Sequence, residues 1–263
     1  MKILEENMKN FIAVGDYLIR SFSQKSQKSW NLKLLDASKQ NDLKTIRRAL
    51  KNQASPNTRD RCDNTPLLHA AYSGAINCVN ELISAGASAN TQNSSGYTAL
   101  IWAAEKGYTN CVKSLISVSD NLDLQNHEGS TALMRATLRG QYQCVEMLIN
   151  AGADINVTNN QGNTALMIAA DHGQIDCLNL FINNQADIDT LNHKRQSAIT
   201  IAADKGDIKC FQQLLHTNAN REHLTNKHRQ EFKNILDEFR NEKQKQHSEQ
   251  IKTKHRALRK FRK

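Results

Sequence analysis

The sequence predicts an all-α protein built as a solenoid, in which short helices stack along one axis. Two observations support this fold class. Threonine or serine, glycine and cysteine each recur at a constant spacing of 33 residues through five successive units. The chain of 263 residues is only 39% hydrophobic and 5% aromatic, which suits an elongated structure with little interior per residue. An invariant period indicates stacked repeats rather than one compact globule.

Residues 1–30 are expected to form an amphipathic helix and a linker. Apolar side chains recur at helical spacing as far as Phe22, and residues 21–30 resemble a polar linker. The helix either packs over the first repeat or contacts a membrane surface or a partner. Asp16 and Arg20 interrupt its apolar stretch, and no run of about 18 apolar residues exists. Neither a membrane span nor a secretory signal is therefore predicted.

The repeat domain is expected at residues 31–220. Its first unit, near Leu32, is degenerate: Asn41 stands at the glycine position, and the threonine and cysteine are missing. A divergent, more polar first unit is typical of an end cap, whose outer face meets water. Six units are therefore predicted, starting near residues 32, 65, 98, 131, 164 and 197, with about twelve short helices in all.

Each of the five regular units is expected to begin with a short helix. A hydroxyl side chain precedes each helix as its predicted cap: Thr65, Thr98, Thr131, Thr164 and Ser197. A glycine follows later in each unit, where a left-handed residue would end the helix: Gly74, Gly107, Gly140, Gly173 and Gly206. Alanine pairs such as Ala103-Ala104 let neighbouring helices approach closely.

A second helix and a polar turn complete each unit. Ser119, Gln185 and Asn218 stand where other copies have glycine after the second helix, and Arg195 replaces the turn glycine of the sixth unit. A left-handed conformation at the first three of these residues would cost about 1 kcal/mol each. The third, fifth and sixth units are therefore expected to be softer than the second and fourth.

Residues 221–263 are expected to form a basic helix or tail. They carry 14 Lys and Arg against 6 Asp and Glu, and so account for most of the net charge of +9. The last twelve residues invite three functional interpretations: nuclear import, contact with nucleic acid, or binding to acidic lipid. The alternative is a solvated tail without a partner. The basic side chains concerned are Lys252, Lys254, Arg256, Arg259, Lys260, Arg262 and Lys263.

The repeat resembles the ankyrin repeat. The resemblance rests on the 33-residue period, on helix starts such as Thr65-Pro66-Leu67-Leu68-His69-Ala70, and on Ala-Gly-Ala-Asp-Ile-Asn at residues 151–156; it covers about residues 32–220. The histidine usual at the fourth position of the helix start is replaced in every copy. The resemblance implies a helix-turn-helix unit with a projecting finger loop.

The cysteines of the five regular units are predicted to be structural. Equivalent residues of stacked helices lie about 8–10 Å apart, whereas a disulfide needs Cα atoms within about 7 Å and zinc needs all ligands around one point. Free thiols imply a reducing compartment, so cytoplasm or nucleus. Cys62 differs, because it lies in a turn and is expected to be exposed. No metal, cofactor or catalytic motif is predicted, and hence no enzyme.

Partners of ankyrin proteins meet the finger turns and the exposed sides of the first helices, which together form a concave surface. In this chain those positions vary between copies while the framework does not. Because Tyr, Trp and Arg dominate interface energetics, the predicted anchor is Tyr72, Tyr97, Trp102, Arg135 and Arg139. Glu105, Asp171 and His172 complete the predicted binding set. The alternative places Trp102 in the core and leaves the others as ordinary surface.

The resemblance therefore predicts a non-catalytic, monomeric adaptor that binds another protein. The alternative is a protein that binds nucleic acid or an acidic membrane through its basic tail. The composition, rich in Asn, Lys and Gln, suggests an AT-rich genome. Ankyrin proteins of that kind occur in intracellular bacteria, which deliver some of them into host cells as effectors, and in protists and other eukaryotes.

Overall fold

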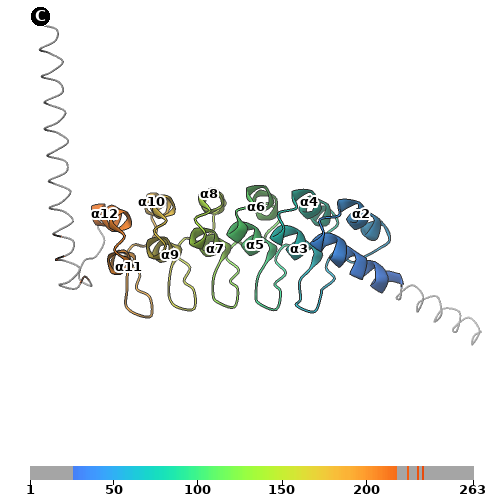
Figure 1. Cartoon of the computed structure of the whole chain (residues 1–263), viewed down its shortest axis with the longest axis horizontal. Helices are drawn as coiled ribbons and strands as arrows, with labels where there is room; N and C mark the ends of the chain where they lie inside the picture. The colour runs from blue at the N-terminus through green and yellow to red at the C-terminus, as the bar shows by residue number, and fades with distance from the viewer. Residues whose placement is uncertain (1–25, 218–223, 225–229, 231–232, 234–263) are drawn as a thin grey trace, which may run out of the picture.

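The computed structural model describes residues 26–217, Leu224, Gln230 and Lys233. Within these residues the chain is helical without strands, and its hairpins stack in a single row (Figure 1). The predicted fold class is confirmed. The expected N-terminal helix and the basic tail lie outside the described residues, as does Asn218.

Six stacked units account for the described chain. The first contains a helix at residues 26–39 and α2 (Leu43–Lys51). The first helices of the next five units are α3 (Pro66–Tyr72), α5 (Ala99–Lys106), α7 (Ala132–Leu138), α9 (Ala165–Asp171) and α11 (Ala198–Lys205). Their second helices are α4 (Ile76–Ser84), α6 (Thr109–Ile116), α8 (Tyr142–Asn150), α10 (Ile175–Asn183) and α12 (Ile208–His216).

The linker expected at residues 21–30 is wrong from residue 26 onward, because residues 26–30 are helical. Tertiary contacts hold this polar stretch in a helix. The centre of the Trp30 ring lies 5.7 Å from Arg48 Cζ of α2, and Gln27 Nε2 donates to Gln53 O at 3.3 Å. The helix crosses the domain boundary that we placed after residue 30.

The helix caps follow the sequence prediction with one exception. In α3, α5, α7 and α9 the threonine hydroxyl accepts from the third backbone N–H of the helix. At α11 the Ser197 N–H instead donates to Thr200 Oγ1 at 2.9 Å, so the neighbouring hydroxyl supplies a cap. The five glycines that follow the first helices all have positive φ, as predicted.

The core is one continuous layer in which each unit buries its apolar face against the next. Leu82, Leu115 and Leu148, at equivalent positions of successive second helices, have no solvent exposure. Burying one such side chain contributes roughly 1.5–3 kcal/mol. Ala70, Ala71, Ala103, Ala104 and Ala136 are also fully buried between neighbouring first helices, which explains the close approach of α5 to α3 and α7.

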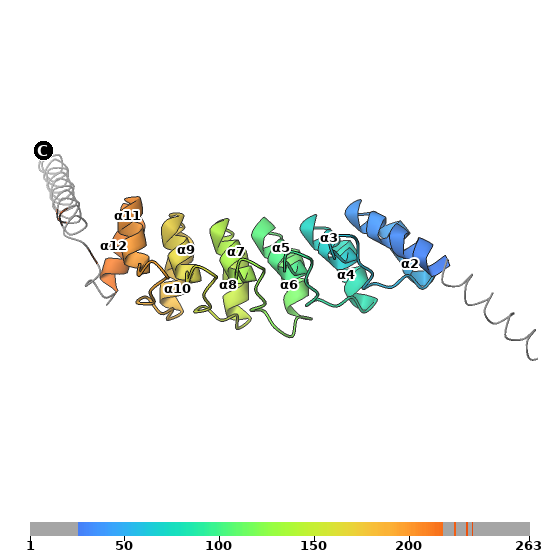
Figure 2. The same ribbon diagram turned by 90° about the horizontal axis from the view of Figure 1, so that it is seen from below.

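A polar finger precedes the first helix of each of units two to six and projects from the row of first helices (Figures 1 and 2). An asparagine organises the turn: Asn126 Oδ1 accepts from Glu128 N at 3.0 Å and from Ser130 N at 2.9 Å. One backbone hydrogen bond joins each finger to the next, from Ser94 N to Cys62 O, His127 N to Ser95 O, Asn160 N to Glu128 O, and His193 N to Gln161 O. These bonds, of 3.0–3.1 Å, align the fingers in register.

Gly96 shows why the finger turn favours glycine. Its φ is +77°, and a Cβ atom at this position would lie 2.7 Å from the backbone nitrogen of His127 in the next finger. A side chain at Gly96 would therefore crowd the next finger. The first finger nevertheless holds Asp63 at the equivalent position with a φ of +59°, and its bond from Ser94 N to Cys62 O is kept.

Candidate functional site

The concave surface lies where the fingers meet the first helices, and its central part is an aromatic stack. The Trp102 ring stacks on Tyr97 with centroids 4.2 Å apart and an interplanar angle of 19°. Tyr72 meets the same indole edge-on at 4.9 Å. Cations cover the two ends, with Lys106 Nζ 4.8 Å from the Tyr72 ring and Arg135 Cζ 5.6 Å from the Tyr97 ring. Three aromatic side chains from two units thus form one block.

A buried carboxylate joins this block to two arginines. Glu105 is 5% exposed, and its oxygens lie 2.9 Å from Arg135 Nη2 and 3.0 Å from Arg139 Nη2. Arg135 also reaches the finger that precedes α7, where it pairs with Glu128 at 3.0 Å. Because Arg135 is only 13% exposed, this network holds the angle between finger and helix rigidly in the fourth unit.

Six of the eight predicted binding residues therefore form one connected set, here called the aromatic–arginine cluster: Tyr72, Tyr97, Trp102, Glu105, Arg135 and Arg139. Much of this cluster is engaged internally. Tyr72 and Arg139 offer the largest free surfaces, with 48% of Tyr72 and 56% of the Arg139 side chain exposed. Trp102 is partly buried. Its exposure is thus intermediate between the two predicted alternatives, a core residue and an exposed anchor.

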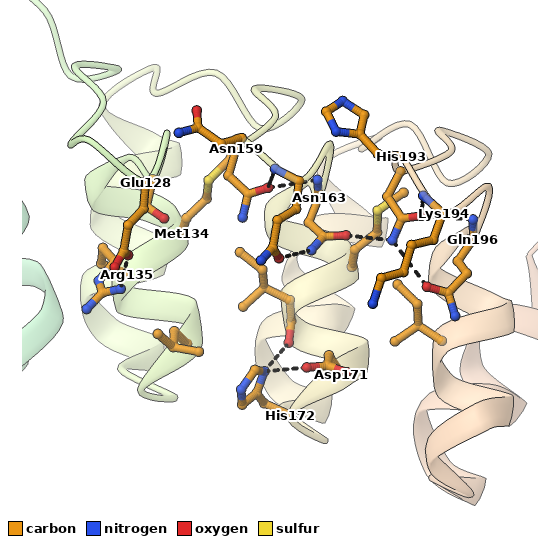
Figure 3. Close-up of a pocket in the computed structure, with 18 of the residues that line it drawn as sticks. Glu128, Met134, Arg135, Asn159, Asn163, Asp171, His172, His193, Lys194 and Gln196 are labelled. Carbon is orange, nitrogen blue, oxygen red and sulfur yellow. Dashed lines mark hydrogen bonds and ion pairs between the residues drawn. The ribbon is translucent and has the colours of Figure 1, made fainter.

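Asp171 and His172, the other two predicted residues, border a groove that spans units four to six. The groove has a volume of about 950 Å³. Its floor is apolar, with Met134, Met167, Ile168 and Ile201. Its rims are polar and come from the fingers and from the ends of the first helices. Figure 3 shows Arg135 with Glu128 toward one end of the groove and Lys194 with Gln196 toward the other.

The groove exists because one position of the first helix changes along the solenoid. In units two to four this position holds His69, Trp102 and Arg135, which all reach their fingers: His69 Nε2 lies 2.9 Å from Asp60 Oδ2, Trp102 stacks on Tyr97, and Arg135 pairs with Glu128. In units five and six it holds Ile168 and Ile201, whose short aliphatic side chains do not fill the space between the finger and the first helix. The change to isoleucine at this position is visible in the sequence, but the predicted binding set did not include these two residues.

The charges along the groove are largely paired. Asp171 bonds Lys205 at 2.9 Å and lies 3.5 Å from His172 Nδ1. Asp204 accepts from Gln196 Nε2 at 2.8 Å. Lys194 is exposed and forms no ion pair within the described residues. The groove lining holds three cations, Arg135, Lys194 and Lys205, beside three carboxylates, Glu128, Asp171 and Asp204, so its formal charges balance.

Formal charge is distributed unevenly along the stack. Residues 26–64 contain nine Lys and Arg against four Asp and Glu, whereas residues 65–217 contain eight against thirteen. The first unit thus carries +5 and the remaining units carry −5. On α2, Lys44, Arg48 and Lys51 follow one another at helical spacing and are exposed.

The recurring cysteines are buried in the core, as predicted, and Cys62 is exposed. Burial raises the pKa of Cys111, Cys144 and Cys177 to about 11, so these thiols are protonated at neutral pH. No group of three metal-ligating side chains gathers anywhere in the described residues. The same part of the chain contains no helix long and apolar enough to cross a membrane.

The structure combines stacked helical hairpins, fingers in register, and a concave face with apolar and paired polar side chains. These features define a repeat scaffold, a class of protein that acts by binding. A family model described as ankyrin repeats (3 copies) matches residues 34–126, 77–159 and 106–192. The chain therefore belongs to the ankyrin-repeat family. Ankyrin repeats are generally modules of protein–protein interaction, and proteins built from them are typically not enzymes. In a comparison with curated proteins, none matches this chain.

Proposed function

We propose that the chain is a non-catalytic scaffold that binds another protein through the concave surface of its repeat domain, residues 31–220. The observation that carries this proposal is the aromatic–arginine cluster. A partner that covers the exposed parts of Tyr72 and Arg139 would meet side chains already held in place by Trp102 and Glu105. Anchors fixed in this way lose little conformational entropy on binding.

The experiment first identifies the partner by affinity purification of the full chain and mass spectrometry, and then measures its affinity for variants. Trp102→Ala with Arg135→Ala removes the centre of the cluster. Tyr72→Ala with Arg139→Ala removes its exposed parts and leaves the ion pair between Glu105 and Arg135 intact. We expect each double variant to bind at least about tenfold more weakly, because anchor residues typically contribute 2 kcal/mol or more.

The matched control is Tyr142→Ala with Lys113→Ala, which changes a partly exposed tyrosine and an exposed lysine on the second helices. Circular dichroism shows whether each variant remains folded. Unchanged affinity in the folded double variants would contradict the proposed anchor. If binding instead disappears when residues 241–263 are deleted and weakens steeply with salt, the tail is responsible, as for nucleic acid or an acidic membrane.

The cellular setting of this binding remains a prediction. A cytoplasmic or nuclear location, delivery into a host cell as an effector and a monomeric state follow only from the cysteines, the composition and the family resemblance.

A further inference from the structure

The helices of the first unit carry positive charge that is not paired with carboxylates of the described chain. Unit one contains nine Lys and Arg, of which three form ion pairs. Five more lie on the helix at residues 26–39 and on α2. They are exposed, form no ion pair within the described residues, and are here called the basic end: Lys28, Lys33, Lys44, Arg48 and Lys51.

We propose that the basic end binds the surface of a membrane rich in acidic lipids, with the side chain of Leu32 inserted among the headgroups. This surface is separate from the concave anchor of the proposed function. It would give the chain a second binding partner of different chemistry.

The stability of α2 does not account for its cations. Arg48 and Lys51 lie in the last turn, where the helix macrodipole favours positive charge. Lys44 lies in the first turn, where the same dipole opposes positive charge, and it stands four residues before Arg48 on the same helix face. Like charges at this spacing destabilise a helix, so an anionic surface would relieve a repulsion that the folded chain retains.

Trp30 brings cations of two helices together. The centre of its ring lies 4.2 Å from Lys33 Nζ of its own helix and 5.7 Å from Arg48 Cζ of α2. The indole is also partly buried. Single-stranded nucleic acids bind where exposed aromatic rings serve as platforms for their bases. Because cations cover the Trp30 ring, the basic end suits a surface of headgroup charges better than stacked bases.

Leu32 adds an apolar group to the charged surface. It is 57% exposed, more than any other large hydrophobic residue of the described chain. It lies one helical turn after Lys28 and directly before Lys33. Exposed apolar side chains beside cations are typical of helices that bind at membrane interfaces, where burial of apolar area adds to electrostatic attraction. Nucleic acid phosphates would leave this side chain in water.

The charge of the other units favours attachment by one end. The first unit forms one end of the described row (Figure 2). Units two to six carry a net charge of −5 within residues 65–217, so an acidic membrane attracts the first unit and repels the rest. The aromatic–arginine cluster would then remain free to bind a protein while the chain is on the membrane.

The test is co-sedimentation of the full chain with vesicles of two compositions. One contains phosphatidylcholine alone, and the other contains equal parts of phosphatidylserine and phosphatidylcholine. We expect at least about tenfold stronger binding to the acidic vesicles, because each cation near an acidic membrane contributes about fivefold in affinity. Binding should weaken as salt is added.

Two variants address the basic end directly. Lys44→Gln with Lys51→Gln removes two cations that form no described ion pair, and should weaken binding to the acidic vesicles at least about tenfold. Lys113→Gln with Lys209→Gln, exposed lysines on α6 and α12, is the matched control and should bind normally. Circular dichroism checks that each variant is folded.

A third variant tests the apolar contact. Leu32→Ser should weaken binding about threefold to tenfold, and the loss should persist at high salt because it is not electrostatic. Val118→Ser, at a 39% exposed position after α6, is its control.

Three results would overturn the inference. Equal binding to both kinds of vesicle would exclude recognition of acidic lipid. If the Lys44 and Lys51 variant binds like its control, while deletion of residues 241–263 abolishes binding, the tail and not the basic end holds the membrane. If the chain binds a DNA duplex but neither kind of vesicle, its basic surfaces recognise nucleic acid. The proposed function is decided separately, by the concave variants and their protein partner in the absence of lipid.

Discussion

Asp60 is the one aspartate among the side chains that organise the described fingers, because the equivalent positions hold Asn93, Asn126, Asn159 and Asn192. Its oxygens accept from the N–H groups of Asn64 and Cys62 and lie 2.9 Å from His69 Nε2. Burial opposes ionisation of the carboxyl group, but these bonds outweigh burial and lower its pKa from 3.8 to about 2. The carboxylate is thus stabilised by the folded chain.

Asp60→Asn should remove part of the acid sensitivity of the protein. A folded-state pKa below the unfolded value contributes stability that is complete above about pH 4 and is lost as pH falls toward 2. Asparagine keeps an oxygen for the Asn64 and Cys62 N–H groups but does not titrate. Urea unfolding at pH 5, 4, 3 and 2 should show a smaller stability loss in the variant, with Asp63→Asn, an exposed aspartate, as control. Parallel curves would contradict this assignment.

The first helices were predictable at the level of single elements, because their signals are local. A hydroxyl, an alanine pair and a glycine at fixed spacing specify the cap, the close packing face and the end of each helix. Residues 26–30 were not predictable in this way, because contacts of Trp30 and Gln27 with residues far along the chain keep a polar stretch helical.

The candidate site was predictable only in part. Tyr72, Trp102 and Arg135 were found because aromatic and arginine residues are conspicuous in a sequence. The groove was missed because it arises where side chains are too short to reach their fingers, and a void has no residue type of its own. Aligning Ile168 with Trp102 in the sequence shows where the side chain becomes short, but only the folded backbone defines the space that results.

Five non-glycine residues of the described chain have a positive φ at positions where other units have glycine: Asn41, Gln53, Asp63, Gln185 and Arg195. Gln185 has φ +60° after α10, and Arg195 has φ +59° in the last described finger, so Gln185→Gly and Arg195→Gly should each stabilise the protein by about 1 kcal/mol. Ser119 is the matched control, because it lacks a positive φ and the left-handed conformation considered for it is wrong. Ser119→Gly should therefore give no gain. Thermal unfolding measures all three, and equal effects would contradict the backbone argument.

At the scale of the whole molecule, each unit is stabilised mainly by its two neighbours. Leu148 and Leu214 are both fully buried, so Leu148→Ala and Leu214→Ala should each cost about 2–5 kcal/mol locally. Their consequences should differ, since Leu148 lies in the fourth unit and Leu214 in the sixth. Hydrogen exchange should show the middle variant opening on both sides of α8, and the end variant opening mainly around α11 and α12.

A uniform loss of protection throughout the chain in both variants would contradict the nearest-neighbour account. The two variants can be compared directly, because both substitutions remove the same side chain from equivalent second helices.

The first unit and the following units carry opposite net charges, so the described stack is an electric dipole. Neighbouring repeats lie about 8–10 Å apart. This spacing is comparable to or longer than the Debye length of about 8 Å at physiological salt, so an approaching macromolecule interacts separately with the positive and the negative region. A charged partner would be turned before it touches the surface. The charge distribution would thus bias the orientation of a partner during diffusion, before contact. Discrimination among partners would begin at that stage.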